Sequence, residues 1–252
     1  MLEDFLSRNH LFYSDTLDLT NNFQKTFKRF NKDCDYNTET NETVKNTCKK
    51  NLKKNLNFSL ANIHLYCNKN FQWNNYLLRK ICIQKYIFAA RNFFHPVING
   101  FVAIRNVSNL GQDFTYSLFS RKEIKRSGMR FLVRGIDKNG YVANFAETEQ
   151  VIITKKNDEI DIVSYMQLRG SIPLFWTQAP NLLLNPSIYF DSENRENYFS
   201  FEKHTLNMTQ DYGGKIIYVN LIDKKGDQNN IGEYLNILHK EYKDFKGKKL
   251  NL

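Results

Sequence analysis

The stretch FLVRGIDKNGYVANFAETEQ, Phe131–Gln150, decides how this sequence is expected to fold. Apolar and polar residues alternate on both sides of the turn sequence DKNG, a pattern typical of a β-hairpin. With two residues at the centre of the turn, one set of side chains from both strands would share a face. That set is Arg130, Leu132, Arg134, Ile136, Ala143, Phe145, Glu147 and Glu149. A three-residue loop would reverse the faces.

The charges on this expected hairpin have two compatible interpretations. In the first, Arg130 and its neighbour Arg134 neutralise Glu147 and Glu149 as ion pairs on an otherwise apolar sheet face. In the second, the carboxylates orient an arginine toward a phosphate-bearing ligand, because a guanidinium held in place loses less entropy on binding. Neither interpretation alone identifies a substrate.

Composition and charge indicate a soluble globular protein that is attracted to polyanions. The chain has 252 residues, 41% of them hydrophobic, and a formal net charge of +10. No signal peptide opens the sequence, and charged residues interrupt the most apolar window, residues 76–104, so we expect a cytosolic or peripheral protein. Nucleic acid is not an expected partner, because no recognition helix or aromatic RNA-binding signature accompanies the lysines.

The four cysteines do not form a metal or redox motif. Cys34, Cys48, Cys67 and Cys82 lack C-x-x-C spacing, and the H-x-x-C pair His64 and Cys67 lacks two further ligands. We therefore expect free thiols in a reducing compartment and no metal site.

The rest of the chain reads as an α/β (α+β) fold. Residues 31–57, rich in Asn and Lys, are expected to be a disordered insert. Residues 73–90 place Trp73, Leu77, Ile81 and Phe88 on one helical stripe, widened by Tyr76. From residue 96 to about 168, β-branched and aromatic segments between turn signals predict an antiparallel β-meander.

The last third predicts a helix, a strand and a second helix. Ser192 could cap the first helix, which would run to about Asp211 and stop at Gly213. KIIYVNLI, residues 215–222, is apolar enough to be an internal strand, but no later segment in the sequence could pack beside it. Asn230 and Glu233 resemble a capping box for the second helix.

Two segments resemble the signatures of one known family. KRSGMRFLVRGIDKNGYVANFAETEQ, residues 125–150, and SYMQLRGSIPLFWTQ, residues 164–178, are similar to the two signature segments of the Sac domain. This domain is the phosphoinositide phosphatase module of Sac1-like and synaptojanin-like proteins. Weaker similarities, such as FYSDTLDLTNNFQ and HPVINGFVAIRN, extend the resemblance over nearly the whole chain apart from the insert.

The resemblance implies a domain division, a substrate and a location. Residues 1–94 would be the end of the Sac N-terminal subdomain, and residues 95–252 the first half of the catalytic subdomain. The substrate would be a phosphoinositide headgroup at a membrane surface, met on the cytosolic face of endomembranes, without metal or other cofactor. The positions that match the family signatures and could contact phosphate are Arg134, Arg169, Gly170 and Ser171. The alternative for Arg169 is a strand-end arginine that pairs with Glu147 or Glu149.

The sequence departs from the family pattern at the nucleophile. Sac domains use a Cys-x5-Arg loop, but the residues six positions after the four cysteines are Thr40, Lys54, Trp73 and Phe88. In the family this loop follows the region of similarity, so the resemblance implies a partial domain that is inactive by itself. The alternatives are a phosphatase completed by a further segment or protein partner, and an inactive Sac-like module that binds anionic lipid or a protein.

Overall fold

The computed structural model describes residues 10–26, 67–82, 95–109, 111–129, 132–156, 159–179, 186–192, 195–213 and 216–249. These residues fall into two compact units, which are described separately. Unit 1 comprises Met1–Ile124 and Ala146–Leu168, and unit 2 comprises Lys125–Phe145 and Arg169–Leu252. The chain therefore passes from unit 1 to unit 2 after Ile124, returns to unit 1 at Ala146 and enters unit 2 again at Arg169.

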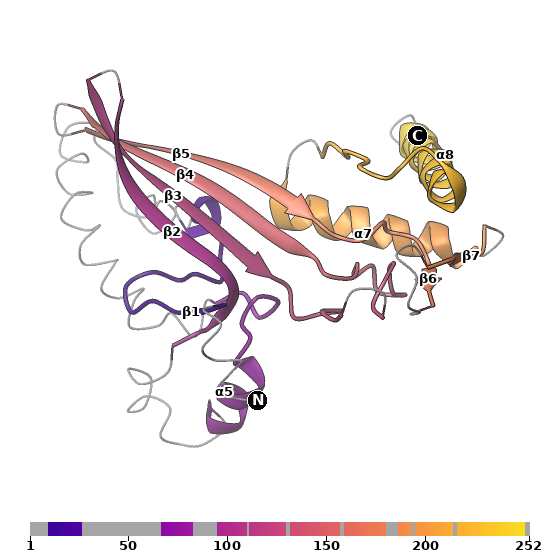
Figure 1. Cartoon of the computed structure of the whole chain (residues 1–252), viewed down its shortest axis with the longest axis horizontal. Helices are drawn as coiled ribbons and strands as arrows, with labels where there is room; N and C mark the ends of the chain where they lie inside the picture. The colour runs from indigo at the N-terminus through magenta and orange to yellow at the C-terminus, as the bar shows by residue number, and fades with distance from the viewer. Residues whose placement is uncertain are drawn as a thin grey trace. The chain divides into compact units, whose positions relative to one another are not determined.

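Unit 1 is built on a five-stranded antiparallel sheet, which confirms the predicted β-meander and the mixed α/β fold class. The strands are hydrogen-bonded in sequence order (Figure 1). They are β1 (Leu11–Phe12), β2 (Ile98–Asn109), β3 (Gln112–Lys122), β4 (Ala146–Lys156) and β5 (Glu159–Arg169). Val102 stands opposite Phe119 on β3, and Phe119 stands opposite Glu149 on β4.

One face of this sheet carries the core of unit 1. Ile98, Phe119 and Val151 are buried there together with Leu19 from the N-terminal segment. Because side chains alternate along each strand, Arg121, Glu147 and Glu149 lie on the same face as these apolar residues.

The charged hairpin predicted for residues 131–150 is wrong in its first strand and in its register. The described residues 132–135 form no strand, and only Ile136 bridges Val142. Asp137 N–H donates to Tyr141 O, which leaves a three-residue loop, 138–140, rather than a two-residue turn. The glutamates instead belong to β4, which pairs with β3 and not with residues 132–136.

The apolar stripe predicted for residues 73–90 is wrong in phase over the residues whose side chains are described, 73–78. Helix α5, Asn75–Cys82, buries Leu78, whereas Leu77 is 62% exposed and Tyr76 is exposed as well. Trp73 precedes the helix and donates its indole N–H to Lys122 O, so it cannot set the phase of the helical face. The side chains of Ile81 and Phe88 lie outside the described residues.

Unit 2 consists of a two-stranded sheet and two long helices (Figure 1). The strands are β6 (Trp176–Gln178) and β7 (Ile188–Phe190), and the helices are α7 (Glu196–Tyr212) and α8 (Gly226–Lys249). Its buried core is formed by Leu174, Phe201, Ile231, Leu238 and Tyr242. The sequence also predicts one apolar face for α8, made of Ile231, Tyr234, Leu235, Leu238 and Phe245. This face is confirmed at Ile231 and Leu238, with Tyr234 and Leu235 packed beside them, while the side chain of Phe245 lies outside the described residues.

Of the three helix ends predicted from the sequence, one is confirmed and two are wrong. Gly213, with φ of 66°, ends α7 as predicted, and its N–H donates to Thr209 O. The cap prediction for Ser192 is wrong, because the N-cap is Arg195, without a side-chain hydrogen bond. Helix α8 already begins at Gly226, so Asn230 lies inside the helix and is no cap.

The internal strand predicted for residues 215–222 is also wrong for the described part. Residues 216–222 run between α7 and α8 without joining a sheet, and Ile217, Val219 and Leu221 are exposed. The pattern of alternating apolar residues is that of a strand, but no neighbouring strand is present among the described residues.

Several predictions fall on residues that the structure does not describe. The insert at 31–57 lies outside the described residues, as do residues 83–94 and Arg130. The division into subdomains near residue 94 therefore stays a prediction.

Candidate functional site

The segment Lys125–Phe145 is shaped by a glycine that no other residue could replace without strain. Gly135 has φ of 66°, and a Cβ there would lie 2.4 Å from Leu174 O. Its N–H donates to Ser171 Oγ at 2.9 Å, and its carbonyl accepts from Ala143 N at 2.8 Å. These bonds fix the backbone on both sides of Gly135 and thereby place Arg134.

A second turn fixes the start of the same segment. Arg126 and Asn144 both have positive φ, 51° and 54°. Asn144 N–H donates to Arg126 O at 3.1 Å, and the Asn144 side chain accepts from Gly128 N at 3.2 Å. Asparagine tolerates this backbone conformation better than most residues, which explains its place in the sequence VANF.

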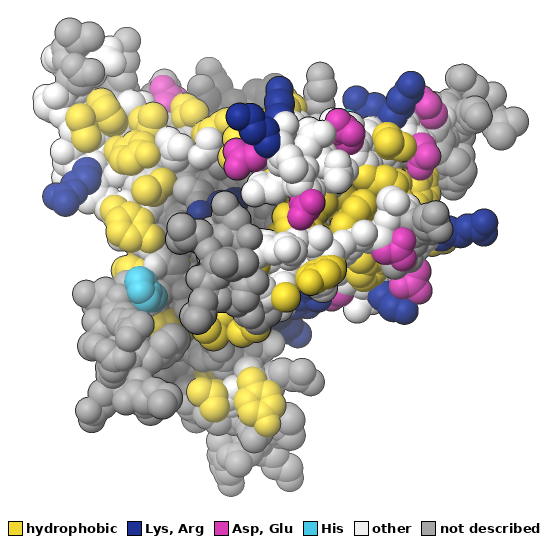
Figure 2. All heavy atoms as spheres, turned by 45° about the vertical axis from the view of Figure 1, so that its right-hand side comes forward, with side chains coloured by type: hydrophobic (Ala, Val, Ile, Leu, Met, Phe, Trp, Pro, Cys, Tyr) yellow, Lys and Arg dark blue, Asp and Glu magenta, His cyan; other side chains and the backbone are white. Residues whose placement is uncertain are grey.

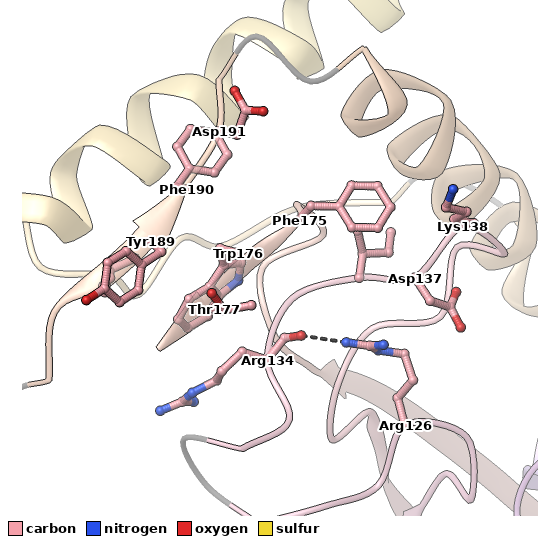
Figure 3. Close-up of a pocket in the computed structure, with 12 residues that line it drawn as sticks. Arg126, Arg134, Asp137, Lys138, Phe175, Trp176, Thr177, Tyr189, Phe190 and Asp191 are labelled. Carbon is pink, nitrogen blue, oxygen red and sulfur yellow. Dashed lines mark hydrogen bonds between the residues drawn. The ribbon is translucent and has the colours of Figure 1, made fainter. Parts of the chain in front are cut away.

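These turns, together with β6 and β7, border an open pocket of about 730 Å³ within unit 2 (Figure 3). Its apolar lining includes Phe175, Trp176 and Phe190. Its charged lining is Arg126, Arg134, Lys138, Asp137 and Asp191, three cationic and two anionic side chains. An aromatic wall with a small number of charged groups is typical of a site for a small polar ligand.

The two arginines of the pocket are held differently. Arg126 Nη2 donates to Arg134 O at 2.5 Å, the bond drawn in Figure 3, and its Nε is buried without a hydrogen-bond partner among the described residues. The guanidinium of Arg134 lies 5.3 Å from the Trp176 ring, and its Nη2 donates to Gln178 Oε1 at 3.2 Å. Arg126 thus supports the loop that carries Arg134.

Polar contacts hold the aromatic wall in place. Phe175 N–H donates to Asn197 Oδ1 at 2.8 Å, while Asn197 Nδ2 donates to Asp191 O at 2.9 Å. Asn197 is fully buried, so it ties together the two chain segments that border the pocket. Gln178 Nε2 donates to Pro186 O at 2.8 Å, which orients the amide that accepts from Arg134.

Lys138 and Asp137 also line the pocket. Lys138 Nζ is 3.1 Å from Glu196 Oε1, and both side chains are largely exposed, so this ion pair adds little stability and can exchange for another anion. Asp137 Oδ1 accepts from the N–H groups of Asn139 and Tyr141, both at 2.9 Å. Asp137 therefore stabilises the loop of residues 138–140 through these two hydrogen bonds.

Of the predicted phosphate-contacting residues, the structure places only Arg134 at the pocket. Arg169 is exposed at the end of β5 and does not line it. Gly170 packs against Val142, where a Cβ would come 2.7 Å from Cγ2. Ser171 does not line the pocket; its hydroxyl accepts from Gly135 N–H and so holds the backbone next to Arg134.

Sequence reasoning overlooked Arg126 and Lys138. Arg126 lies within the first signature segment, two residues before Gly128. Its position in that segment is the one feature of the sequence that could have indicated it as a site residue. Lys138 was counted only as a turn residue.

The predicted supporting glutamates belong to a buried ionic cluster in unit 1. Arg121 Nη2 lies 3.0 Å from Glu149 Oε2, and Arg121 Nη1 lies 3.4 Å from Glu147 Oε2. The three side chains are only 1–2% exposed. Glu149 also accepts from Phe23 N at 2.9 Å and Ser164 Oγ at 2.7 Å, so it joins β3, β5 and the N-terminal segment. Sequence reasoning did not single out Arg121.

The surface offers no continuous basic patch on the face in Figure 2. Lys and Arg side chains are interspersed there with Asp and Glu among the described residues. In the described part of the chain, no helix is long and apolar enough to span a membrane. No group of three or more His, Cys, Asp or Glu side chains among those residues could hold a metal ion.

Comparison with known proteins identifies the family. The family model described as SacI homology domain matches residues 1–252. The chain belongs to the SacI homology domain family.

Several members of the Sac family are similar to this chain over about two thirds of its length. Phosphatidylinositol-3-phosphatase SAC1-B of Danio rerio is 37% identical over 161 residues, which are 64% of this chain and 26% of that protein. Phosphatidylinositol-3-phosphatase SAC1 of Drosophila melanogaster is 34% identical over 163 residues, 65% of this chain and 26% of that protein. Phosphoinositide phosphatase SAC3 of Arabidopsis thaliana is 37% identical over 167 residues, 64% of this chain and 20% of that protein. This chain thus spans about a quarter or less of the length of these relatives.

Proposed function

We propose that this chain is the part of a Sac-family phosphoinositide phosphatase that binds the headgroup phosphates. The observation that carries the proposal is the pocket of unit 2, where Arg126, Arg134 and Lys138 border an aromatic wall. The names of the relatives, phosphatidylinositol-3-phosphatase and phosphoinositide phosphatase, support this substrate class.

In this proposal Arg134 and Lys138 contact the phosphate oxygens. Guanidinium groups form two parallel hydrogen bonds with phosphate, and the stacking of Arg134 on Trp176 limits the entropy that such binding costs. Lys138 would exchange its exposed partner Glu196 for the ligand. Ser171 would act through its bond to Gly135, and Gly170 through its close packing against Val142. Arg169 lies outside the pocket lining, so it would contact a phosphate group that extends from the pocket toward the end of β5.

The chemical step in the proposal requires a cysteine thiolate that attacks phosphorus. No cysteine of the 252 residues begins a Cys-x5-Arg sequence, so we expect this chain alone to bind without releasing phosphate. The thiolate would come from a further segment or a protein partner, without a metal ion. The competing function is an inactive Sac-like module that binds anionic lipid.

The place of action in the proposal is the cytosolic face of endomembranes, where a peripheral protein can reach phosphoinositide headgroups. The net charge of +10 favours contact with an anionic membrane surface. We expect no role for nucleic acid.

Sedimentation with vesicles tests the binding proposal. Phosphatidylcholine vesicles with phosphatidylinositol phosphates should bring down more of the 252-residue chain than vesicles in which phosphatidylserine supplies the same charge. The variant Lys138→Met should weaken the phosphoinositide-dependent part, while Arg105→Met, an exposed arginine on β2, should not. Equal sedimentation with both lipids would show that charge alone attracts the chain and would contradict the proposed site.

A phosphate-release assay separates the two functions. The chain alone should release no phosphate from a water-soluble phosphoinositide above a buffer blank. If addition of a Sac-family segment with a Cys-x5-Arg loop produces phosphate release, this chain is one part of a phosphatase. If binding is found but no such segment restores release, the inactive module is favoured.

A further inference from the structure

The loop that carries Lys138, one of the cationic side chains of the pocket, is held by two sets of hydrogen bonds. In the first set, the N–H groups of Asn139, Gly140 and Tyr141 all donate to Asp137, at 2.9–3.0 Å. In the second set, the carbonyl oxygens of the three loop residues accept hydrogen bonds from side chains of helix α7. Because both the donors and the acceptors of its backbone are bonded, the loop keeps the Cα of Lys138 in one place.

Three side chains of α7 make the second set, each with one carbonyl oxygen. Lys203 Nζ donates to the first loop carbonyl at 2.8 Å, Asn207 Nδ2 to the second at 3.4 Å, and His204 Nδ1 to the third at 3.0 Å. A carbonyl oxygen can only accept, so Nδ1 is the nitrogen of His204 that carries the proton. We call these three side chains the α7 clamp.

The loop also approaches the backbone of α7 closely. Gly140 has φ of 84°, and a Cβ there would lie 2.7 Å from His204 N and 3.0 Å from the carbonyl carbon of Lys203. Glycine is therefore required at this position. The same helix contacts the other end of Lys138, because Glu196 in its first turn pairs with the ammonium group. None of the α7 clamp residues lines the pocket, so their effect on a ligand must pass through the loop.

We propose that the α7 clamp positions Lys138 for the ligand phosphate, with His204 as the central positioning residue. His204 is 8% exposed and Lys203 is exposed, so the bond from His204 to Gly140 is the better shielded from water. Without the α7 clamp, the loop would change conformation freely in the unbound chain, and binding would have to order it. This inference rests on the proposed function of the pocket.

Two substitutions at His204 separate its hydrogen bond from its packing. Asparagine carries an amide nitrogen close to the position of Nδ1, so His204→Asn can still donate to Gly140 O, although it fills less space. His204→Leu fills the space and cannot donate. In calorimetric titration of the 252-residue chain with a water-soluble phosphatidylinositol monophosphate, His204→Leu should weaken binding about five- to tenfold and His204→Asn less than about twofold. The opposite order would overturn the proposal, because it is the order expected for packing alone.

A double substitution shows whether the effect passes through Lys138. In a chain that already carries Lys138→Met, His204→Leu should cause no further loss of affinity, because no ammonium group is left to position. Losses that multiply in the double variant would mean that His204 supports the pocket in general and would overturn its assignment to Lys138.

Lys203→Met tests the α7 clamp without disturbing a buried side chain, so the proposal can be judged even if His204→Leu does not fold. This variant removes an exposed donor to the loop and should weaken binding at least about twofold. Lys240→Met, at an exposed lysine on α8 in the same unit, removes the same charge and should leave the affinity unchanged. Equal affinities of the two variants would overturn the proposal.

Hydrogen exchange measures the loop itself, without ligand. The amides of Asn139, Gly140 and Tyr141 should be protected in wild type and in His204→Asn and should exchange faster in His204→Leu. Equal protection in all three chains would show that the α7 clamp does not order the loop. Wild-type binding that His204→Leu and Lys203→Met both leave unchanged would overturn this inference alone. Absence of saturable binding in wild type would overturn the proposed function, and this inference with it.

Discussion

At the scale of residues, the buried cluster around Arg121 determines the stability of unit 1. The variant Arg121→Met removes the cation that lies 3.4 Å from the buried carboxylate of Glu147 and 3.0 Å from that of Glu149, so the free energy of unfolding should fall by about 3–5 kcal/mol. Urea denaturation followed by tryptophan fluorescence measures this change. Arg105→Met, at an exposed position, should cost less than about 0.5 kcal/mol. Similar losses for the two variants would mean that the cluster adds no stability.

A buried histidine makes unit 2 sensitive to acid. Burial lowers the pKa of His204 below 6.5, although its bond to the Gly140 carbonyl acts in the opposite direction. Protons therefore bind the unfolded chain first, and stability should be full above about pH 6.5 and fall as the pH drops from there toward the lowered pKa. The pKa of His239 is lowered by burial and by Lys243, so it adds an effect of the same sign.

Melting temperatures between about pH 7.5 and pH 5 test this dependence. His204→Gln should give a shallower fall than wild type, with the remainder due to His239. His10→Gln, at an exposed position, should melt like wild type at every pH. An identical slope in His204→Gln and wild type would exclude His204 as the source.

The sequence pattern singled out Arg134 but not Arg121, and the difference has a physical cause. Arg134 lies in a signature segment whose spacing is visible without a structure. The role of Arg121 depends on the register between β3 and β4, which are separated in sequence by the whole of Lys125–Phe145. No pattern among neighbouring residues indicates a pairing between strands that are this far apart in the sequence.

At the scale of elements, the loop that carries Arg134 depends on Gly135 more than its backbone angle alone suggests. Gly135 and Gly213 both have φ of 66°, but a Cβ at residue 135 would lie 2.4 Å from Leu174 O, whereas one at residue 213 meets nothing within 4 Å. The change Gly213→Ala, at φ of 66° and ψ of −179°, should therefore cost only the backbone strain, about 1–3 kcal/mol, and Gly135→Ala distinctly more. Thermal unfolding of the two variants measures the difference, and equal losses would contradict the close approach.

Elements with local signals were predicted and those fixed by distant contacts were not. The strands β2 to β5 alternate in polarity and are bounded by turns, so the sequence identified them. The segment 132–136 alternates in the same way, but Ile136 N–H donates to Leu174 O, and Ser171 accepts from Gly135. These contacts with residues far along the chain replace the strand pairing that the local pattern favoured.

At the scale of the whole molecule, the fold class and the family were predictable, while the pocket was not. The mixed order of strands and helices indicated an α/β fold, and the signature segments indicated the Sac family. The pocket combines Arg126 and Lys138 from one part of the sequence with β6 and β7 from another, and only the folded chain brings them together.

Calorimetric titration of the 252-residue chain with a water-soluble phosphatidylinositol monophosphate tests the central claim most directly. We predict saturable binding of one ligand per chain, weakened at least about tenfold in Arg134→Met, as expected for the loss of one charge-assisted hydrogen bond, and unchanged in Arg105→Met. Absence of saturable heat in wild type, or equal affinity in Arg134→Met and wild type, would contradict the assignment of this pocket as the headgroup site.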